Sequence, residues 1–390
     1  MTYRRAAIPA LIGGLLLTAL LWWAGASSEA LRLPGSQSVL GFEQTAELAR
    51  RLAPWTYAPA SGGTGDATVV DGSYLSLRTT AMQIRFCAVL AFFVPGALLL
   101  ARRLPPVQGR MPATLLALWA WGIVAGVLAV TVSAPWLIAS GGRGSYRILP
   151  QLASVIASGR QPLVAAALVT AVVTALIARI TAKGARDLPR ADVPARPARQ
   201  GATAGTAVIA FSLLVLSYES VAAAIQTAPA PAGLLDEPGD LLRQWLLLGA
   251  WAGPAGVPFT TWLLYRAADL VVLALVWWGL RRLPGLLTRV TVPAMAAGAV
   301  SATVIGLLVS QSLRIALDGT GRQYGLLYAF GNLGNGVPAA LIWGVAAGVV
   351  ATLTLRVALR REGAAGERAA GQTPGDPQGV TGPAARGGES

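Results

Sequence analysis

Histidine is absent from this chain of 390 residues, and cysteine occurs only once, as Cys87. The lack of histidine excludes histidine-ligated haem, zinc and copper sites, and every Ser-His or Cys-His catalytic pair. A single cysteine excludes an intrachain disulfide. The sequence also contains no Walker motif and no nucleophile elbow. We therefore expect no cofactor and no bound metal, and an enzymatic reaction would have to use carboxylates.

Charged residues are scarce as well. They make up 12% of the chain, whereas hydrophobic residues make up 54%, and an ordinary globular protein has about 25% charged residues. The net charge of +14 could suggest nucleic acid, but the basic residues gather at the ends of apolar runs and form no single basic face. We expect the lipid bilayer as a partner and no nucleic acid. The predicted fold class is an all-α, polytopic transmembrane helix bundle.

Eight apolar runs are long enough to cross a membrane. They cover residues 6–26, 82–101, 112–140, 162–181, 202–224, 261–280, 291–313 and 337–359. The first run follows Arg4 and Arg5 and ends in small residues, so it could be a signal peptide. Its length favours an uncleaved first span. Eight spans place both termini on one side of the membrane.

Two long segments lie on the opposite side from the termini. Residues 27–80 include an amphipathic helix at Phe42–Leu52 but are too few to bury a core of their own, so we expect them to pack on the membrane domain. Residues 229–261 contain an apolar stretch at 241–251 that is too short to span. We interpret this stretch as an interfacial or re-entrant helix.

The linker and the tail lie on the side of the termini. Residues 182–200 are basic and rich in proline, which predicts an irregular, extended linker. Residues 362–390 have almost no large apolar side chain, which predicts a disordered tail. Arginine and lysine number 19 on this side and 10 on the other. By the positive-inside rule both termini are cytoplasmic, in a multi-pass protein of the plasma membrane.

A short basic segment between two spans occurs twice. Residues 102–110 (the first hinge) run from Arg-Arg-Leu-Pro to Arg, and residues 281–289 (the second hinge) repeat this frame 179 residues later. A Gly-rich loop ending in tyrosine follows each at a similar offset. We therefore predict a tandem duplication into four-span repeats at 1–181 and 201–361. An even number of spans makes the repeats parallel, as in several transporter folds.

Ionisable residues within spans are costly and are the first candidates for a functional site. Arg266 and Asp269 lie three residues apart on one helical face, so they can pair. Glu219 and Arg85 are predicted at comparable depths in other spans. These four residues form either a ligand-binding or gating cluster near the outer surface, or a structural salt bridge that holds helices together. The structural alternative is the simpler one.

Three functions remain open from the sequence. A transport-related subunit with a path between the halves predicts that the polar cluster faces a water-filled cavity. A cell-envelope interaction or assembly protein, bound to unidentified protein subunits, predicts a tightly packed bundle with the cluster paired. A membrane enzyme predicts an outer carboxylate in a groove open to lipid, and the candidates are Glu43, Glu47, Asp66 and Asp71.

Overall fold

The computed structural model describes the helical core of the chain and several connecting residues. The described residues are 3–31, 41–57, 72–106, 109–140, 152, 155–156, 158–182, 193–214, 259–318 and 333–371. Glu219, the apolar stretch at 241–251, Asp66 and Asp71 lie outside these ranges.

Within the described ranges every regular element is a helix. The elements are α1 (Tyr3–Ala30), α3 (Phe42–Leu52), the 3-10 turn η1 (Ala53–Trp55), α4 (Gly72–Arg103), α5 (Met111–Ala139), α7 (Arg160–Ala182), α8 (Ala195–Leu214), α11 (Phe259–Leu286), α12 (Val292–Asp318) and α15 (Val337–Gly371). Among the described residues, seven helices are long and apolar enough to cross a membrane. The predicted all-α polytopic bundle is confirmed. The fifth predicted span, 202–224, lies in α8, and the structure describes it only as far as Leu214.

The four helices of each half form a ring, and they follow the same order around the ring in both halves. In the first half, α1 and α5 each contact α4 and α7; in the second, α8 and α12 each contact α11 and α15. The halves meet mainly through α5 and α12. A duplication predicts this correspondence, but the duplication itself stays a prediction.

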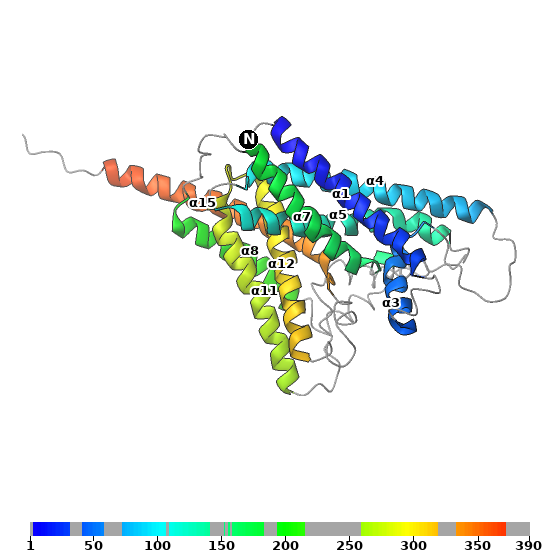
Figure 1. Cartoon of the computed structure of the whole chain (residues 1–390). Helices are drawn as coiled ribbons and strands as arrows, with labels where there is room; N and C mark the ends of the chain where they lie inside the picture. The colour runs from blue at the N-terminus through cyan, green and yellow to red at the C-terminus, as the bar shows by residue number, and fades with distance from the viewer. Residues whose placement is uncertain are drawn as a thin grey trace, which may run out of the picture.

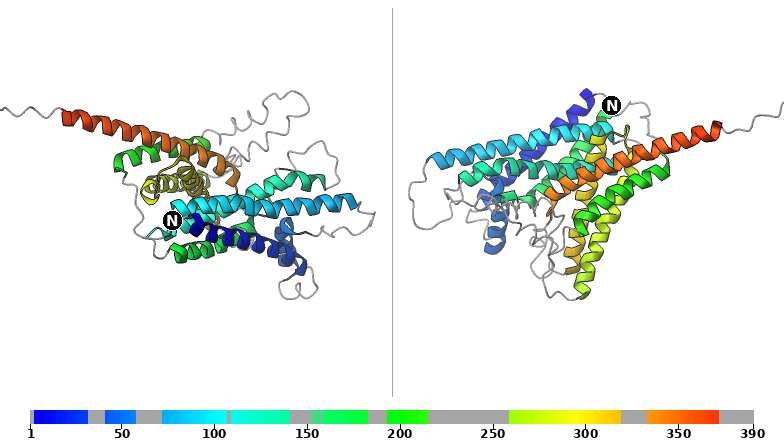
Figure 2. Two further views of the ribbon diagram at one scale, coloured as in Figure 1. Left: turned by 90° about the horizontal axis from the view of Figure 1, so that it is seen from above. Right: turned by 180° about the vertical axis from the view of Figure 1, so that it is seen from behind.

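A backbone hydrogen bond joins the two halves at their hinges. The Thr288 backbone N–H donates a hydrogen bond of 3.0 Å to the Arg103 carbonyl oxygen and joins the second hinge to the first. From this junction α11 and α12 diverge from α4 and α5, and their far ends lie apart (Figures 1 and 2). The start of α1, both hinges and the end of α15 lie at one end of the bundle. We call it the hinge end, and the opposite end the outer end.

Small residues bring neighbouring helices into close contact, as is common in membrane bundles. A Cβ atom added at Gly344 of α15 would lie 2.7 Å from the Val300 Cα of α12. One added at Gly348 would lie 2.5 Å from the Ala296 Cα. Backbone atoms therefore pack directly against each other here.

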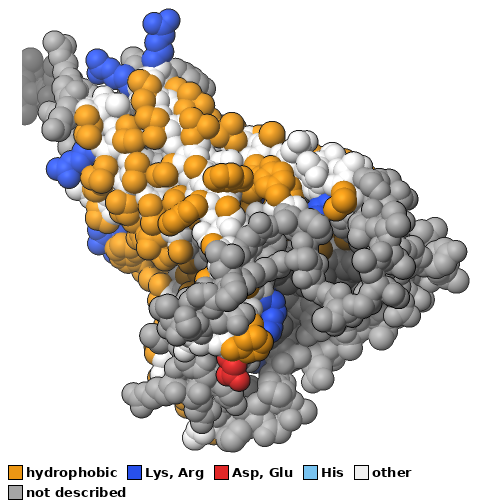
Figure 3. Space-filling view, turned by 45° about the vertical axis from the view of Figure 1, so that its right-hand side comes forward, with side chains coloured by type: hydrophobic (Ala, Val, Ile, Leu, Met, Phe, Trp, Pro, Cys, Tyr) orange, Lys and Arg blue, Asp and Glu red, His pale blue; other side chains and the backbone are white. Residues whose placement is uncertain are grey.

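The side chains on the surface of the bundle are mostly hydrophobic, and most of the basic groups visible in Figure 3 gather at one end of the surface.

Two predicted boundaries are wrong. Helix α8 begins at Ala195, inside the range 182–200 predicted as extended. Its Pro197 falls in the first turn, where a missing N–H costs no helical hydrogen bond. Helix α15 continues to Gly371, so the predicted disordered tail at 362–390 begins as a helix. Alanine, glutamate and arginine, which have high helix propensity, make up seven of the ten residues 362–371, and the other three are glycines.

Candidate functional site

A buried carboxylate joins two helices of the second half near the outer end. Arg314 Nη2 of α12 donates a hydrogen bond of 2.7 Å to Asp269 Oδ1 of α11. Arg266 Nη1, one turn earlier on α11, lies 3.6 Å from Asp269 Oδ2. Asp269 is only 6% exposed. The predicted pairing of Arg266 with Asp269 is present, and the stronger partner of the carboxylate is Arg314.

Arg314 was missed from the sequence because the seventh span was predicted to end at Leu313. The helix in fact continues to Asp318. Arg314 also lies over the Tyr265 ring, with Cζ 5.3 Å from the ring centroid. An arginine placed at the same depth as Asp269, on the next span, was the signal that could have found it. One carboxylate between two guanidinium groups serves better as an interhelical link than as a proton carrier.

Arg85 belongs to a different cluster, in the first half. Its Nε donates a hydrogen bond of 2.8 Å to Ser133 Oγ of α5, and its Nη1 donates to the Pro54 carbonyl oxygen. Its guanidinium lies over the Trp55 ring, 5.6 Å from the centroid. Arg85 stands about 27 Å along α4 from Arg103, close to the hydrocarbon thickness of about 30 Å. The structure therefore places Arg85 at the outer boundary and does not bring it to Asp269.

Trp55 fixes residues 41–57 to the outer end of the first half. The side chain is fully buried, and its Nε1 donates a hydrogen bond of 2.9 Å to the Gly159 carbonyl oxygen. The next residue, Thr56, donates through Oγ1 to the Gly25 carbonyl oxygen of α1 at 3.0 Å. A Cβ atom added at Gly25 would lie 2.0 Å from the Trp55 carbonyl oxygen. This part of the predicted outer segment thus packs on the membrane domain, as expected for a segment without its own core.

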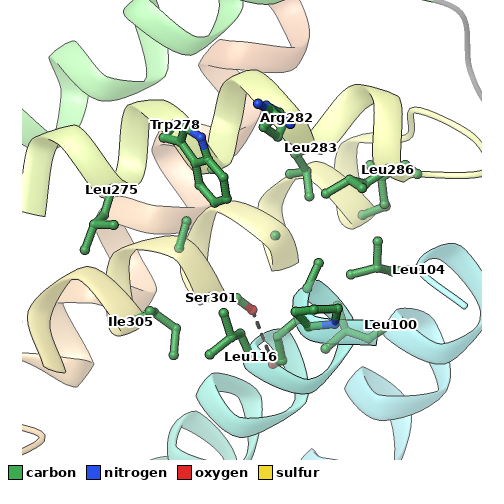
Figure 4. Close-up of a pocket in the computed structure, with 18 of the residues that line it drawn as sticks. Leu100, Leu104, Leu116, Leu275, Trp278, Arg282, Leu283, Leu286, Ser301 and Ile305 are labelled. Atoms are coloured by element: carbon green, nitrogen blue, oxygen red, sulfur yellow. Dashed lines mark hydrogen bonds between the residues drawn. The ribbon is translucent and has the colours of Figure 1, made fainter. Parts of the chain in front are cut away.

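An apolar groove lies between the two halves at the hinge end. Its volume is about 380 Å³. Side chains from α4, α5, α11 and α12 line it, among them Leu100, Leu104, Leu116, Leu275, Trp278 and Ile305 (Figure 4). Ser301 Oγ, in the wall of the groove, donates to the Ala297 carbonyl oxygen at 2.8 Å and to the Ala117 carbonyl oxygen at 3.4 Å. The second bond crosses from one half to the other.

The groove covers half the depth of the membrane. The spanning part of α11 is Leu263–Leu286 and that of α12 is Val292–Leu317. The deepest residues of the groove on these helices, Leu275 and Ile305, lie at the midpoints of the two spans. From Leu275 to Leu286 the distance along α11 is about 17 Å. The groove therefore extends from the hinge end to the centre of the bilayer.

Of the outer acids that could support an enzyme, the structure describes Glu43 and Glu47. Glu43 and Glu47 both lie on α3, and Glu47 forms ion pairs with Arg50 at 3.2 Å and with Arg51 at 2.8 Å on the same helix. Neither glutamate lines the groove.

The polar cluster and the groove are thus separate features, and neither matches one functional hypothesis completely. The cluster is paired, as an assembly protein predicts. A groove lies between the halves, where a transport subunit would have its path, but its walls are apolar and do not include the cluster, so it is not the water-filled cavity that the transport hypothesis predicts at these residues. Function must be argued from these features alone, because no protein-family model, no curated protein and no solved structure matches this chain.

Proposed function

We propose that this integral membrane protein is a transport-related subunit whose substrate path runs between its two halves. The observation that carries the proposal is the groove, which both halves line and which extends from the hinge end to the bilayer centre. Ligand paths between repeat halves are a feature of parallel-repeat transporters. The duplication and the transport activity support each other as hypotheses, but each needs its own test.

The arrangement of the halves also favours a path. They are joined at the hinge end by the Thr288–Arg103 backbone hydrogen bond, and the outer ends of α11 and α12 lie apart from those of α4 and α5 (Figure 1). The halves also pack against each other through α5 and α12, where the Ser301 hydroxyl donates to the Ala117 carbonyl oxygen, so tilting one half against the other requires these two helices to slide past each other. Such a rocking motion would close the outer ends and open the hinge end, which alternating access requires.

An assembly protein without a solute path is the second candidate. The pairing of Asp269 with Arg314 and Arg266 favours it, because an ion pair that joins α11 to α12 stiffens one half. The two functions differ in one measurable property: a transporter populates at least two arrangements of its halves, and a scaffold populates one.

Distance measurements between spin labels separate the two. In a Cys87→Ser background, Thr80→Cys on α4 and Thr260→Cys on α11 place one label near the outer end of each half, at exposed positions. We expect two resolved distance populations in lipid nanodiscs, whose ratio shifts when the membrane lipid is changed. A control pair within the first half, Thr80→Cys with Val132→Cys, should give one population. A single, invariant population for both pairs would refute the transport path and favour the assembly protein.

A further inference from the structure

We infer that the groove binds an acyl chain of an anionic phospholipid from the leaflet at the hinge end, with the lipid phosphate held by Arg282. This inference rests on the groove that carries the proposed function, and it names the chemical class of the occupant. Three features of the described residues support it: the chemistry of the walls, the depth of the groove and the charge at its rim.

The walls of the groove suit a hydrocarbon chain. They consist almost entirely of leucine, alanine, isoleucine, tryptophan and glycine. The hydroxyl of Ser301 is already donated to the carbonyl oxygens of Ala297 and Ala117. A polar solute would lose its hydration in this groove and gain few hydrogen bonds, which is unfavourable. An aliphatic chain makes no hydrogen bonds with water, so it loses none when it enters the groove.

The depth of the groove matches one leaflet. Its length of about 17 Å along α11 is close to half of the hydrocarbon thickness of about 30 Å. It ends at the midpoints of α11 and α12 and does not continue to the outer end. A lipid standing in its own leaflet has its chain in this range and its head group at the hinges.

The rim of the groove is basic and lacks acids. Arg282 is exposed, lines the groove and stacks on Trp278, with Cζ 5.5 Å from the ring centroid. None of the ion pairs found among the described residues involves Arg282, and neither hinge contains aspartate or glutamate. In Figure 4, Trp278 and Arg282 lie together on α11, with the Trp278 ring pointing into the groove and Arg282 at its upper edge. Basic pockets between spans on the cytoplasmic side are typical of anionic head-group sites.

Arg281 provides a matched control. It is the neighbour of Arg282 on the same helix, but it stacks on Trp277, with Cζ 5.2 Å from the ring centroid. Trp277 faces α8, where its Nε1 lies 3.4 Å from Thr203 Oγ1. Arg281 does not line the groove. Both arginines carry the same charge at the same depth. If lipid were attracted only by the general surface charge, substitution of either arginine would weaken lipid binding equally.

Native mass spectrometry of the full chain in mild detergent tests the inference. Phosphatidylglycerol and phosphatidylcholine with identical chains are added in turn, and the bound fraction of each is measured. We expect Arg282→Gln to weaken phosphatidylglycerol binding about fivefold, the effect of one arginine near an anionic head group. Arg281→Gln should leave it unchanged. Ala302→Phe, which fills the groove near its deep end, should reduce the binding of both lipids.

Several results would overturn the inference. Equal effects of Arg282→Gln and Arg281→Gln would show that no specific head-group site exists at Arg282. Unchanged binding in Ala302→Phe would show that the chain lies elsewhere; Ala113→Phe, from the opposite wall, repeats this test if the first variant fails to fold. If the lipid does not bind at Arg282 but the spin labels still show two distance populations, only the lipid inference is refuted. If the lipid binds at Arg282 but the spin labels show a single population, the transport path is refuted and the lipid site remains.

Discussion

Trp55→Ala should lower the free energy of unfolding by about 3–5 kcal/mol, the range for removing a large, fully buried aromatic side chain. The indole is enclosed by the first half, so its removal leaves a cavity. Its hydrogen bond to the Gly159 carbonyl oxygen and its stacking under Arg85 are lost at the same time. Arg85 then loses an aromatic face at the boundary of the membrane, where a guanidinium group depends on its few partners.

Denaturant unfolding in mixed micelles measures this effect. Trp55→Phe keeps most of the volume but removes the Nε1 donor, and it should cost about 1–2 kcal/mol. Trp23→Ala is the control, because Trp23 is 66% exposed on α1, and its loss should change the stability by less than about 0.5 kcal/mol. If Trp55→Ala and Trp23→Ala cost the same, residues 41–57 are not anchored to the first half through Trp55.

Asp269→Asn should cost about 3 kcal/mol of unfolding free energy, the low end of the range for breaking a buried ion pair. The change leaves Arg314 and Arg266 as two like charges with no carboxylate between them. Their side chains are 28% and 27% exposed, and this partial hydration keeps the cost from being larger. Because Asp269 and Arg314 lie on different spans, the loss should separate α11 from α12 at the outer end.

A double-mutant cycle distinguishes this link from a general effect of substitution. Adding Arg314→Gln to Asp269→Asn should restore part of the stability, because it removes one of the two unneutralised charges. Glu47→Gln serves as the control: its partners Arg50 and Arg51 lie on the same exposed helix, and such pairs contribute about 0.3–0.5 kcal/mol. Strict additivity of Asp269→Asn and Arg314→Gln would mean that the two side chains do not interact in the membrane.

The sequence predicted what depends on local pattern. Apolar runs located the spans, and the spacing of three residues predicted that Arg266 and Asp269 share a helical face. Arg314 was not predicted, because its partner lies 45 residues away and the predicted span ended at Leu313, five residues before the end of the helix. The groove depends on how α4 and α5 meet α11 and α12, and hydropathy carries no information about that. The burial of Trp55 could not be predicted either, because its contacts with Gly159 and Arg85 join residues that are far apart in the sequence.

The closed ring of the first half has a consequence for how the protein is made. Helices α1, α4, α5 and α7 complete their mutual contacts without any residue beyond Ala182. During synthesis the amino-terminal unit can therefore assemble in the membrane before the second half has left the ribosome, as amino-terminal domains generally do. Thr288 follows α11, so its bond to Arg103 can form only after the first ring has been synthesised. Lipid is the solvent at the surface of that first ring until α11 and α12 arrive and complete the groove.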